Sequence, residues 1–398
     1  MPATTRRRNR AFRQRAGRLC PTPLAALLLI LALLVPGFAR AQAMLPPGPL
    51  STRGSQIVAA DGTPVRIMGV GVFTDVSADV ARIKAAGFNT LRISWGNRRR
   101  LADVARIDRI VAAAAPIGLR VILDNHYNEG LRGMCVAQQK NGLWYDLGGA
   151  SDGTDGCGTP GTVTDAKFVA DWVAMAEHFR GNPTVIGYDL RNEPLAYPGM
   201  TTWEAGSRNP DHNIRWMYER VGRAIQAVDP DKLIICEGPQ NYSRSFASRA
   251  PAPWGDLSLA GRLPVELPVA GKVVYSVHDY PAEIAGYHPD SGPVKVAQMN
   301  RTWGYLVMQG IAPVLVGEMA SNMKGPTSAA WADTLTAYMN GDAPDGPRFT
   351  PPDQPIGGVW WWAGSDDHSG DQPSGIWDNE GKLRPEQRAV WGKLRPRE

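Results

Sequence analysis

The stretch VIGYDLRNEP, residues 185–194, places a short apolar run directly before a polar one that contains Arg191, Asn192 and Glu193. An amphipathic helix is predicted next, at residues 213–228, where the apolar side chains fall on one helical face. A buried strand followed by a covering helix is the repeating unit of a parallel sheet. The polar end of this strand therefore stands where such a sheet carries its functional side chains.

The same unit recurs along the chain, with apolar strands alternating with amphipathic helices. The eight predicted strands comprise residues 65–72, 89–95, 119–126, 185–194, 232–238, 273–280, 312–319 and 357–364. A short hairpin around the Asp61-Gly62 turn overlaps the start of this series. Eight units favour a closed (β/α)8 TIM barrel over an open doubly wound sheet. The first strand is not followed by a Gly-rich phosphate loop, which argues against a dinucleotide fold.

Residues 1–43 have the pattern of an export signal, with an arginine-rich start, an apolar stretch and small residues up to Ala43. A membrane anchor is the alternative, but the apolar stretch is shorter than the roughly 20 residues that span a bilayer. We expect cleavage near Ala41 or Ala43, leaving residues 44–398 as a single domain without a membrane anchor. The mature protein is then secreted or periplasmic, and both the Sec and the Tat export routes stay open.

The charge of the mature chain differs from that of the whole sequence. The predicted signal holds eight arginines and no acidic residue, so its removal lowers Lys+Arg from 43 to 35 against 38 Asp+Glu. The basic balance therefore belongs to the signal and not to a nucleic-acid surface. We expect an uncharged partner, no nucleic acid, and a monomer.

The cysteines do not have the spacing of a metal site. Cys135 and Cys157 lie in one Gly-rich loop, where a disulfide is possible in an oxidising compartment, and the sequence leaves that pairing open. Cys236 stands in an apolar strand and is predicted to be a buried free thiol. No zinc motif is present, and we predict neither a metal nor a cofactor.

Polar and aromatic residues gather at the predicted carboxyl ends of the strands, which form the active-site face of a (β/α)8 barrel. They are Arg92, His126, Asn192, Glu193, Glu237, His278, Tyr280, Glu318 and the run Trp360–Trp362. Each alone has a structural explanation, and we assign Glu237 one, as a helix cap or a support for another residue. Strand alternation would put Trp360 and Trp362 on one face and Trp361 on the other. Together these residues indicate a site.

Two glutamates at such a face suit the cleavage of a glycosidic bond. One carboxyl protonates the leaving oxygen and the other attacks the anomeric carbon, at a separation of about 5 to 5.5 Å in retaining enzymes. A tryptophan offers a sugar ring an apolar surface. The metal-binding acids of phosphoryl transfer and the Ser or Cys nucleophile of acyl transfer are not visible.

Five segments resemble the motifs of glycoside hydrolase family 5, in the order that the family has them. GNPTVIGYDLRNEP resembles its acid/base signature, APVLVGEM its nucleophile strand and VVYSVHDY its His-x-Tyr strand; NTLRIS and LRVILDNH resemble its second-strand arginine and third-strand histidine. The resemblance runs from about residue 55 to the C-terminus and extends to bacterial secreted endo-β-1,4-glucanases. It implies a retaining β-glycosidase.

The resemblance also implies roles for individual residues. Glu193 would be the general acid/base and Glu318 the nucleophile. Asn192 would bond the sugar 2-hydroxyl, while Arg92 and Tyr280 would keep Glu318 ionised and oriented. With Glu318 ionised, the pKa of the acid should be raised, which predicts a bell-shaped pH profile.

Three further residues complete the implied site. His126 and His278 would contact the sugar or position the carboxyls, and Trp362 would form the platform beneath the sugar. The eighth strand is one residue longer than the family pattern, so Trp360 is an alternative platform. The first strand also departs from the pattern, because Gly71 stands where many members have asparagine.

The leading function is a retaining endo-β-1,4-glucanase (cellulase) that acts on a β-glucan polysaccharide or oligosaccharide. Mannan, xyloglucan and mixed-linkage glucan are alternative substrates, and a catalytically silent glycan-binding barrel is a different class. A purely structural barrel would leave the polar strand ends unexplained. The candidates for further sugar stacking are Trp144, Tyr145, Trp203, Tyr242 and Trp254.

Overall fold

A computed structural model describes residues 44–128, 143–146, 162–196, 201–240, 255–285, 291–364, 375–378 and 380–394. Eight parallel strands form a closed barrel in the order β10-β11-β4-β5-β6-β7-β8-β9. They are β4 (Met68–Val72), β5 (Thr90–Gly96), β6 (Arg120–Tyr127), β7 (Val185–Asp189), β8 (Leu233–Glu237), β9 (Val273–Asp279), β10 (Val314–Met319) and β11 (Gly357–Trp360). Each lies within one residue of a predicted strand or inside it, and the (β/α)8 prediction is confirmed.

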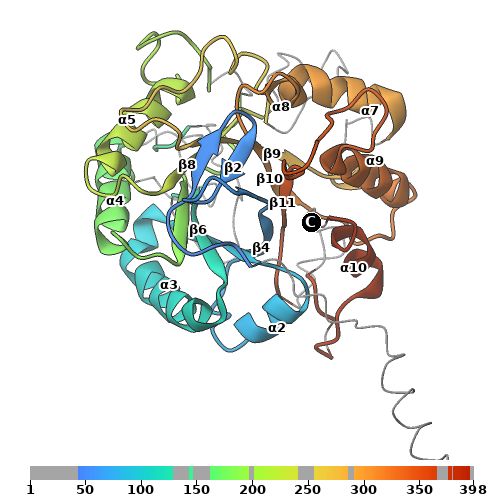
Figure 1. The fold of residues 1–398 in the computed structure, drawn as a ribbon. Helices are drawn as coiled ribbons and strands as arrows, with labels where there is room; N and C mark the ends of the chain where they lie inside the picture. The colour runs from blue at the N-terminus through green and yellow to red at the C-terminus, as the bar shows by residue number, and fades with distance from the viewer. Residues whose placement is uncertain are drawn as a thin grey trace, which may run out of the picture. The chain divides into compact units, whose positions relative to one another are not determined.

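Helices surround the barrel and cover the outer faces of the strands (Figure 1). They are α2 (Val80–Ala85), α3 (Arg100–Ala114), α4 (Asp165–His178), α5 (Ile214–Gln226), α6 (Ala282–Ala285), α7 (Gly292–Met299), α8 (Tyr305–Met308), α9 (Ser328–Asn340) and α10 (Pro385–Trp391). Helix α5 buries the predicted apolar face, including Met217, Val221 and Ile225. In the described residues, no helix has both the length and the apolarity to cross a membrane.

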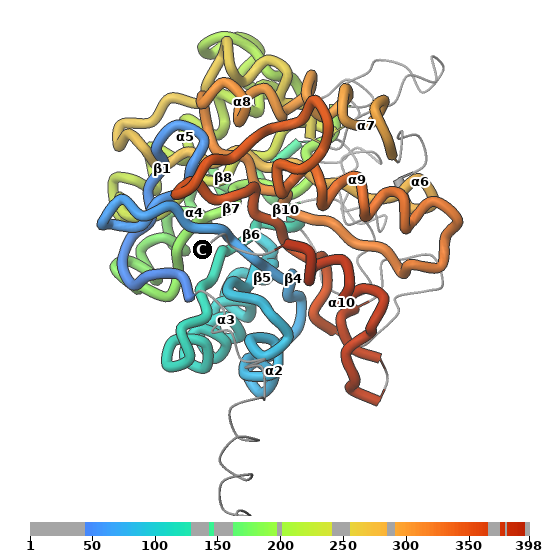
Figure 2. Tube along the Cα trace, turned by 45° about the vertical axis from the view of Figure 1, so that its right-hand side comes forward, coloured from blue at the N-terminus to red at the C-terminus, as the bar shows by residue number. Residues whose placement is uncertain are grey.

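The last helix, α10, packs against α9 and reaches the end of the first helix, α2. Both views place α10 beside α2 and α9 (Figures 1 and 2). The Trp391 indole donates a hydrogen bond to the carbonyl of Ala86, with a nitrogen–oxygen distance of 3.1 Å. Its ring also lies 5.3 Å from those of Phe88 and Trp360, measured between centroids. These contacts fix α10 to the barrel at the side of its first strand.

A small antiparallel sheet of β1 (Ser51–Arg53), β2 (Gln56–Val58) and β3 (Pro64–Val65) covers the amino-terminal end of the barrel. Its apolar residues join one buried cluster with the early parts of the barrel strands. The members include Ile57, Val65, Ile122, Ile235, Val274, Leu315 and Val359. Because this end is filled with apolar side chains, the polar strand ends lie at the opposite, carboxyl face.

The eighth strand does not continue the regular alternation that we predicted for its three tryptophans. Pairing in β11 ends at Trp360, whose ring packs on Trp391 of α10. Trp361 and Trp362 both lie against Phe73 instead, with ring centroids 5.4 and 5.2 Å away. The prediction that Trp360 and Trp362 share a face was therefore wrong, because the chain bends where the strand ends.

The same bend explains the glycine at position 71. A Cβ added to Gly71 would lie 1.9 Å from the carbonyl oxygen of Trp361, and the Gly71 carbonyl accepts the N–H of Ala363 at 2.9 Å. An asparagine cannot fit there without moving the backbone of the eighth strand. The departure from the family pattern is thus tied to the path of the chain before Trp362.

We expect Gly71→Ala to lower the free energy of unfolding by about 1 to 3 kcal/mol, because overpacking against backbone cannot be relieved by a rotamer change. Urea denaturation would measure it. Gly187→Ala is the matched control, since its added Cβ would come no closer than 3.3 Å to its neighbours. Equal stability of the Gly71 variant and wild type would contradict this account.

Candidate active site

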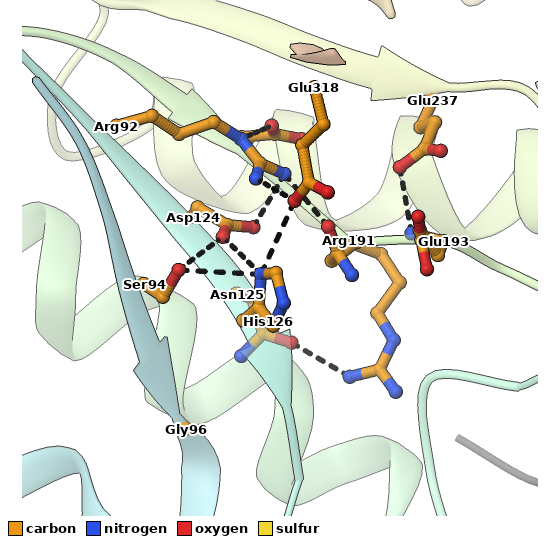
Figure 3. Close-up of polar contacts among 12 residues, drawn as sticks. Arg92, Ser94, Gly96, Asp124, Asn125, His126, Arg191, Glu193, Glu237 and Glu318 are labelled. Atoms are coloured by element: carbon orange, nitrogen blue, oxygen red, sulfur yellow. Dashed lines mark hydrogen bonds and ion pairs between the residues drawn. The ribbon is translucent and has the colours of Figure 1, made fainter. Parts of the chain in front are cut away.

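Arg92, on β5, is the centre of a buried polar network at the carboxyl face (Figure 3). Its guanidinium donates to Glu318 Oε1 at 2.6 Å, to Asp189 Oδ2 at 2.8 Å and to Asp124 Oδ1 at 3.0 Å. The same group donates to Asn192 Oδ1 at 3.0 Å. One cation therefore connects side chains from β5, β6, β7 and β10 and fixes their relative positions.

Burial and neighbouring charges shift the pKa values of this network in opposite directions. Burial alone would lower the pKa of Arg92, but the carboxylates of Asp124, Asp189 and Glu318 outweigh it and raise that pKa. Burial would likewise raise the pKa of Asp124, yet Arg92 and His126 lower it to about 2. Burial prevails at Asp189, aided by the Asp124 charge, and raises its pKa to about 7. Asp124 is consequently the firmly ionised partner of Arg92.

Glu318, on β10, is held from two sides. Arg92 donates to its Oε1, and the Tyr280 hydroxyl donates to its Oε2 at 2.6 Å. Burial and the nearby carboxylates raise the pKa of Tyr280 well above its usual value, so the tyrosine keeps its proton. His126 lies close as well, with Nδ1 3.9 Å from Glu318 Oε1 and 2.6 Å from Asp124 Oδ2. Both oxygens of Glu318 are thus oriented by donors.

The residues after β7 take an irregular path. Asn192 donates its backbone N–H to the carbonyl of Asn125 at 3.0 Å, and Glu193 has a positive φ of 45°. The buried Arg191 side chain points away from Glu318 and donates to Asn125 and Asn128 at the end of β6 (Figure 3). The polar end of the strand therefore has two purposes: Arg191 anchors the turn, and Asn192 and Glu193 face the site.

Glu193 and Glu318 approach one another with His278 between them. His278 Nδ1 is 2.7 Å from Glu193 Oε1 and 3.5 Å from Glu318 Oε2. One ligand atom of each of the three residues lies within 4.8 Å of the others, a donor set that a divalent cation could also use. Burial lowers the pKa of His278 to about 3, so its ring is neutral between the acids.

Trp362 borders a cavity of about 290 Å³, whose lining contains none of the residues that bond to Arg92. The segment after β4 and residues around Trp377 complete its lining, and Arg82 stacks over the Trp377 ring at 4.4 Å. Trp360, the alternative platform, is fully buried against α10. Of the two tryptophans, Trp362 is therefore the one with space beside it.

The structure brings all eight sequence-predicted site residues to the carboxyl face, and it adds two that sequence reasoning missed. Asp124 and Asp189 both pair with Arg92. The spacing of Asp124 and His126 carried a signal, because residues two apart on a strand face the same side. Glu237, predicted as a cap or support, accepts the backbone N–H of Glu193 at 2.7 Å.

The aromatic residues that we predicted as additional sugar-stacking candidates differ in their exposure. Trp144 and Trp203 are buried, and their indoles donate to Asp165 and to the carbonyl of Leu263. They pack loops and present no free face. Tyr145 is half-buried. The other candidates, together with the cysteine pair, lie outside the described residues: Tyr242, Trp254, Cys135 and Cys157.

The closed parallel barrel and the facing carboxyls at its carboxyl end define a (β/α)8 protein with an acid-pair site. The family model described as cellulase (glycosyl hydrolase family 5) matches residues 58–343. The chain belongs to glycosyl hydrolase family 5, as the sequence motifs predicted.

Curated relatives agree with the family. An endoglucanase of Paenibacillus polymyxa is 28% identical over 286 residues, which are 65% of this chain and 64% of that protein. The major extracellular endoglucanase of Xanthomonas campestris pv. campestris is 24% identical and covers 71% of this chain and 61% of its own length. The chain thus spans less than two thirds of either relative.

Solved structures share the fold. An endocellulase from Pyrococcus horikoshii, crystallised with cellotetraose, superposes with a TM-score of 0.69 at 22% identity, covering 88% of this chain and 100% of its own. The catalytic domain of the Xanthomonas endoglucanase gives 0.66 at 21% identity, covering 87% and 99%.

Proposed function

We propose that the protein is a retaining endo-β-1,4-glucanase that cleaves cellulose-type chains by double displacement. The proposal is carried by one observation: in a member of family 5, two carboxyls and a neutral imidazole present atoms within 4.8 Å of one another. Retaining glycosidases hold their carboxyls about 5 to 5.5 Å apart, while inverting enzymes need about 6.5 to 9.5 Å for a water. The short spacing supports the retaining mechanism.

In this mechanism Glu193 protonates the leaving oxygen while Glu318 attacks the anomeric carbon. Hydrogen bonds from Arg92 and Tyr280 orient the Glu318 carboxylate for this attack. Water then cleaves the glycosyl-enzyme ester, with Glu193 acting as the base. Each half of the reaction thus begins with one carboxyl charged and the other neutral.

The remaining residues bind the sugar. The Asn192 side-chain nitrogen is buried and has no hydrogen-bond partner among the described residues, so it has a donor available for the 2-hydroxyl. His126 lies edge-on to Phe73 and within reach of Glu318, where it would contact the same sugar. Trp362 would form the platform beneath that sugar, because its indole offers an apolar face for the ring to stack against.

The deciding experiment is product analysis with purified mature protein on carboxymethyl cellulose, mannan, xyloglucan and mixed-linkage glucan. We expect shorter oligosaccharides from the β-glucans and, by NMR, a first product with the β configuration. Cleavage of mannan or xyloglucan alone would move the assignment to that substrate. Binding without any cleavage would overturn it in favour of a silent glycan-binding barrel.

The pH dependence should have two limbs. The reaction needs Glu318 as a carboxylate and Glu193 as a protonated acid, so kcat/KM should be bell-shaped with pH. His278 contributes to neither limb, since its pKa of about 3 leaves it neutral throughout. Initial rates on cellotetraose across pH would test this, and a profile flat on both sides would refute it.

We further propose that residues 1–43 are an export signal, on the basis of their arginine-rich and apolar pattern. The substrate supports this, because a glucan polymer is met outside the cytoplasm. Amino-terminal sequencing of the mature protein should begin near residue 42 or 44. A protein that retains Met1 at its amino terminus would contradict it.

A further inference from the structure

The backbone at Glu193 has a conformation that needs support. Its φ of 45° is left-handed, which a non-glycine residue adopts at a cost of about 1 to 3 kcal/mol. Such a conformation persists only where the surroundings impose it. Because the side chain direction follows from φ, the groups that impose it also aim the Glu193 carboxyl.

Two hydrogen bonds hold this turn from opposite sides. The Asn192 N–H donates to the Asn125 carbonyl on β6, and the next N–H, that of Glu193, donates to Glu237 Oε2 on β8 at 2.7 Å. Figure 3 shows the Glu237 side chain reaching to the backbone of Glu193. The support from β8 therefore comes from a side chain and can be removed by mutation.

Glu237 is itself fixed and has no access to solvent. Its side chain is fully buried, and the Tyr218 hydroxyl donates to its backbone carbonyl at 2.8 Å. Burial, together with the charges of Glu193 and Asp189, raises its pKa well above the usual value. A neutral carboxyl still accepts the Glu193 N–H through its carbonyl oxygen and adds no charge beside the acid.

The same oxygen of Glu237 also faces His278. His278 Nε2 lies 3.5 Å from Glu237 Oε2, while Nδ1 on the other side of the ring lies 2.7 Å from Glu193 Oε1. Glu237 thus contacts the backbone N–H of Glu193 and lies beside the imidazole at the Glu193 carboxyl, two groups that help to orient this residue. Glu237 approaches the nucleophile indirectly, through His278, whose Nδ1 lies 3.5 Å from Glu318 Oε2.

We propose that Glu237 is a positioning residue for the acid/base, holding the left-handed turn that directs the Glu193 carboxyl at the leaving oxygen. This inference rests on the proposed function. It predicts an effect on proton transfer to the leaving group and little effect on substrate binding or on attack by Glu318. A residue that served only stability would slow all substrates alike.

The test compares aryl β-cellobiosides that differ in their need for an acid. A 2,4-dinitrophenyl leaving group departs as a stable anion without protonation, whereas a phenyl group or a sugar needs a proton from the acid to depart. Glu237→Leu removes the acceptor at similar volume. We expect kcat/KM to fall about 10²-fold on phenyl cellobioside and cellotetraose, the scale of a misplaced catalytic group, and far less on the dinitrophenyl substrate.

Two conservative variants distinguish the hydrogen bond from packing. Glu237→Gln keeps an acceptor oxygen and should recover most of the lost rate. Glu237→Asp keeps the carboxyl but withdraws it by one methylene from the Glu193 N–H, and it should show the same dependence on leaving group as the leucine variant. The aspartate variant also carries the test if the leucine variant does not fold.

Glu219 provides the matched control. It is also a buried glutamate that accepts a backbone N–H, from Glu266 at 3.0 Å, and it pairs with Arg215 on α5. Glu219→Leu should change the rates on all aryl substrates by the same factor.

The outcomes separate this inference from the proposed function. Equal losses on both aryl substrates in Glu237→Leu or Glu237→Asp, while Glu193→Ala shows a leaving-group dependence, would overturn the role of Glu237 alone. Full activity of both variants would overturn it too. Failure of the wild type to hydrolyse any cellobioside or cellotetraose would overturn the proposed function and, with it, this inference.

Discussion

Glu318→Gln is expected to lower turnover of cellotetraose at least about 10⁴-fold while leaving its affinity for the sugar nearly unchanged. Glutamine has the shape of glutamate, and its amide oxygen can still accept the 2.6 Å hydrogen bond from Arg92. An amide cannot form the glycosyl ester, so the double displacement stops at its first step. Calorimetric titration with cellotetraose, beside steady-state rates, would measure both quantities.

The nucleophile can also be identified directly. A 2-deoxy-2-fluoro cellobioside with a good leaving group slows the release of the covalent intermediate, so wild type should accumulate a label on the peptide that contains Glu318. Glu318→Gln should take up no label, while Glu219→Gln, a buried glutamate on α5, should be labelled as wild type is. A label on Glu193 would exchange the two roles, and undiminished turnover in Glu318→Gln would refute the mechanism.

The position of the site residues at the carboxyl face could be predicted from the sequence, because it depends only on where each strand ends. Strand ends in a parallel barrel meet at one face wherever they stand in the sequence, so Glu193 and Glu318 had to lie near one another. The strands and helices of the barrel could be predicted from the periodicity of apolar residues, as the buried face of α5 shows. No knowledge of side-chain packing was required.

What the sequence concealed lies where strand pairing is irregular. The register shifts between Val316 and Glu318, and β11 loses its pairing at Trp360. Alternation cannot predict which way side chains face beyond such points, which is why the tryptophan run was misplaced. Two partners of Arg92 were also hidden, because Asp124 and Asp189 pair with it across strands, and pairing across strands depends on register.

Glu193→Ala is the second large effect, expected to lower kcat/KM on cellotetraose by about 10² to 10⁴-fold, the usual contribution of a general acid. On 2,4-dinitrophenyl cellobioside the first step needs no acid, so kcat/KM should stay near that of wild type. The second step still lacks its base, so kcat should fall and KM should fall with it as the intermediate accumulates. Stopped-flow release of dinitrophenolate should therefore show a burst.

Azide separates a missing base from a damaged site. The anion attacks the glycosyl-enzyme without base assistance, so it should restore kcat of Glu193→Ala on the dinitrophenyl substrate and yield β-cellobiosyl azide. It should not restore Glu318→Gln, in which no ester forms. Loss of activity on both substrates, without rescue by azide, would mean that Glu193 maintains the structure of the site and does not transfer the proton. The positive φ of Glu193 makes this a specific alternative to exclude.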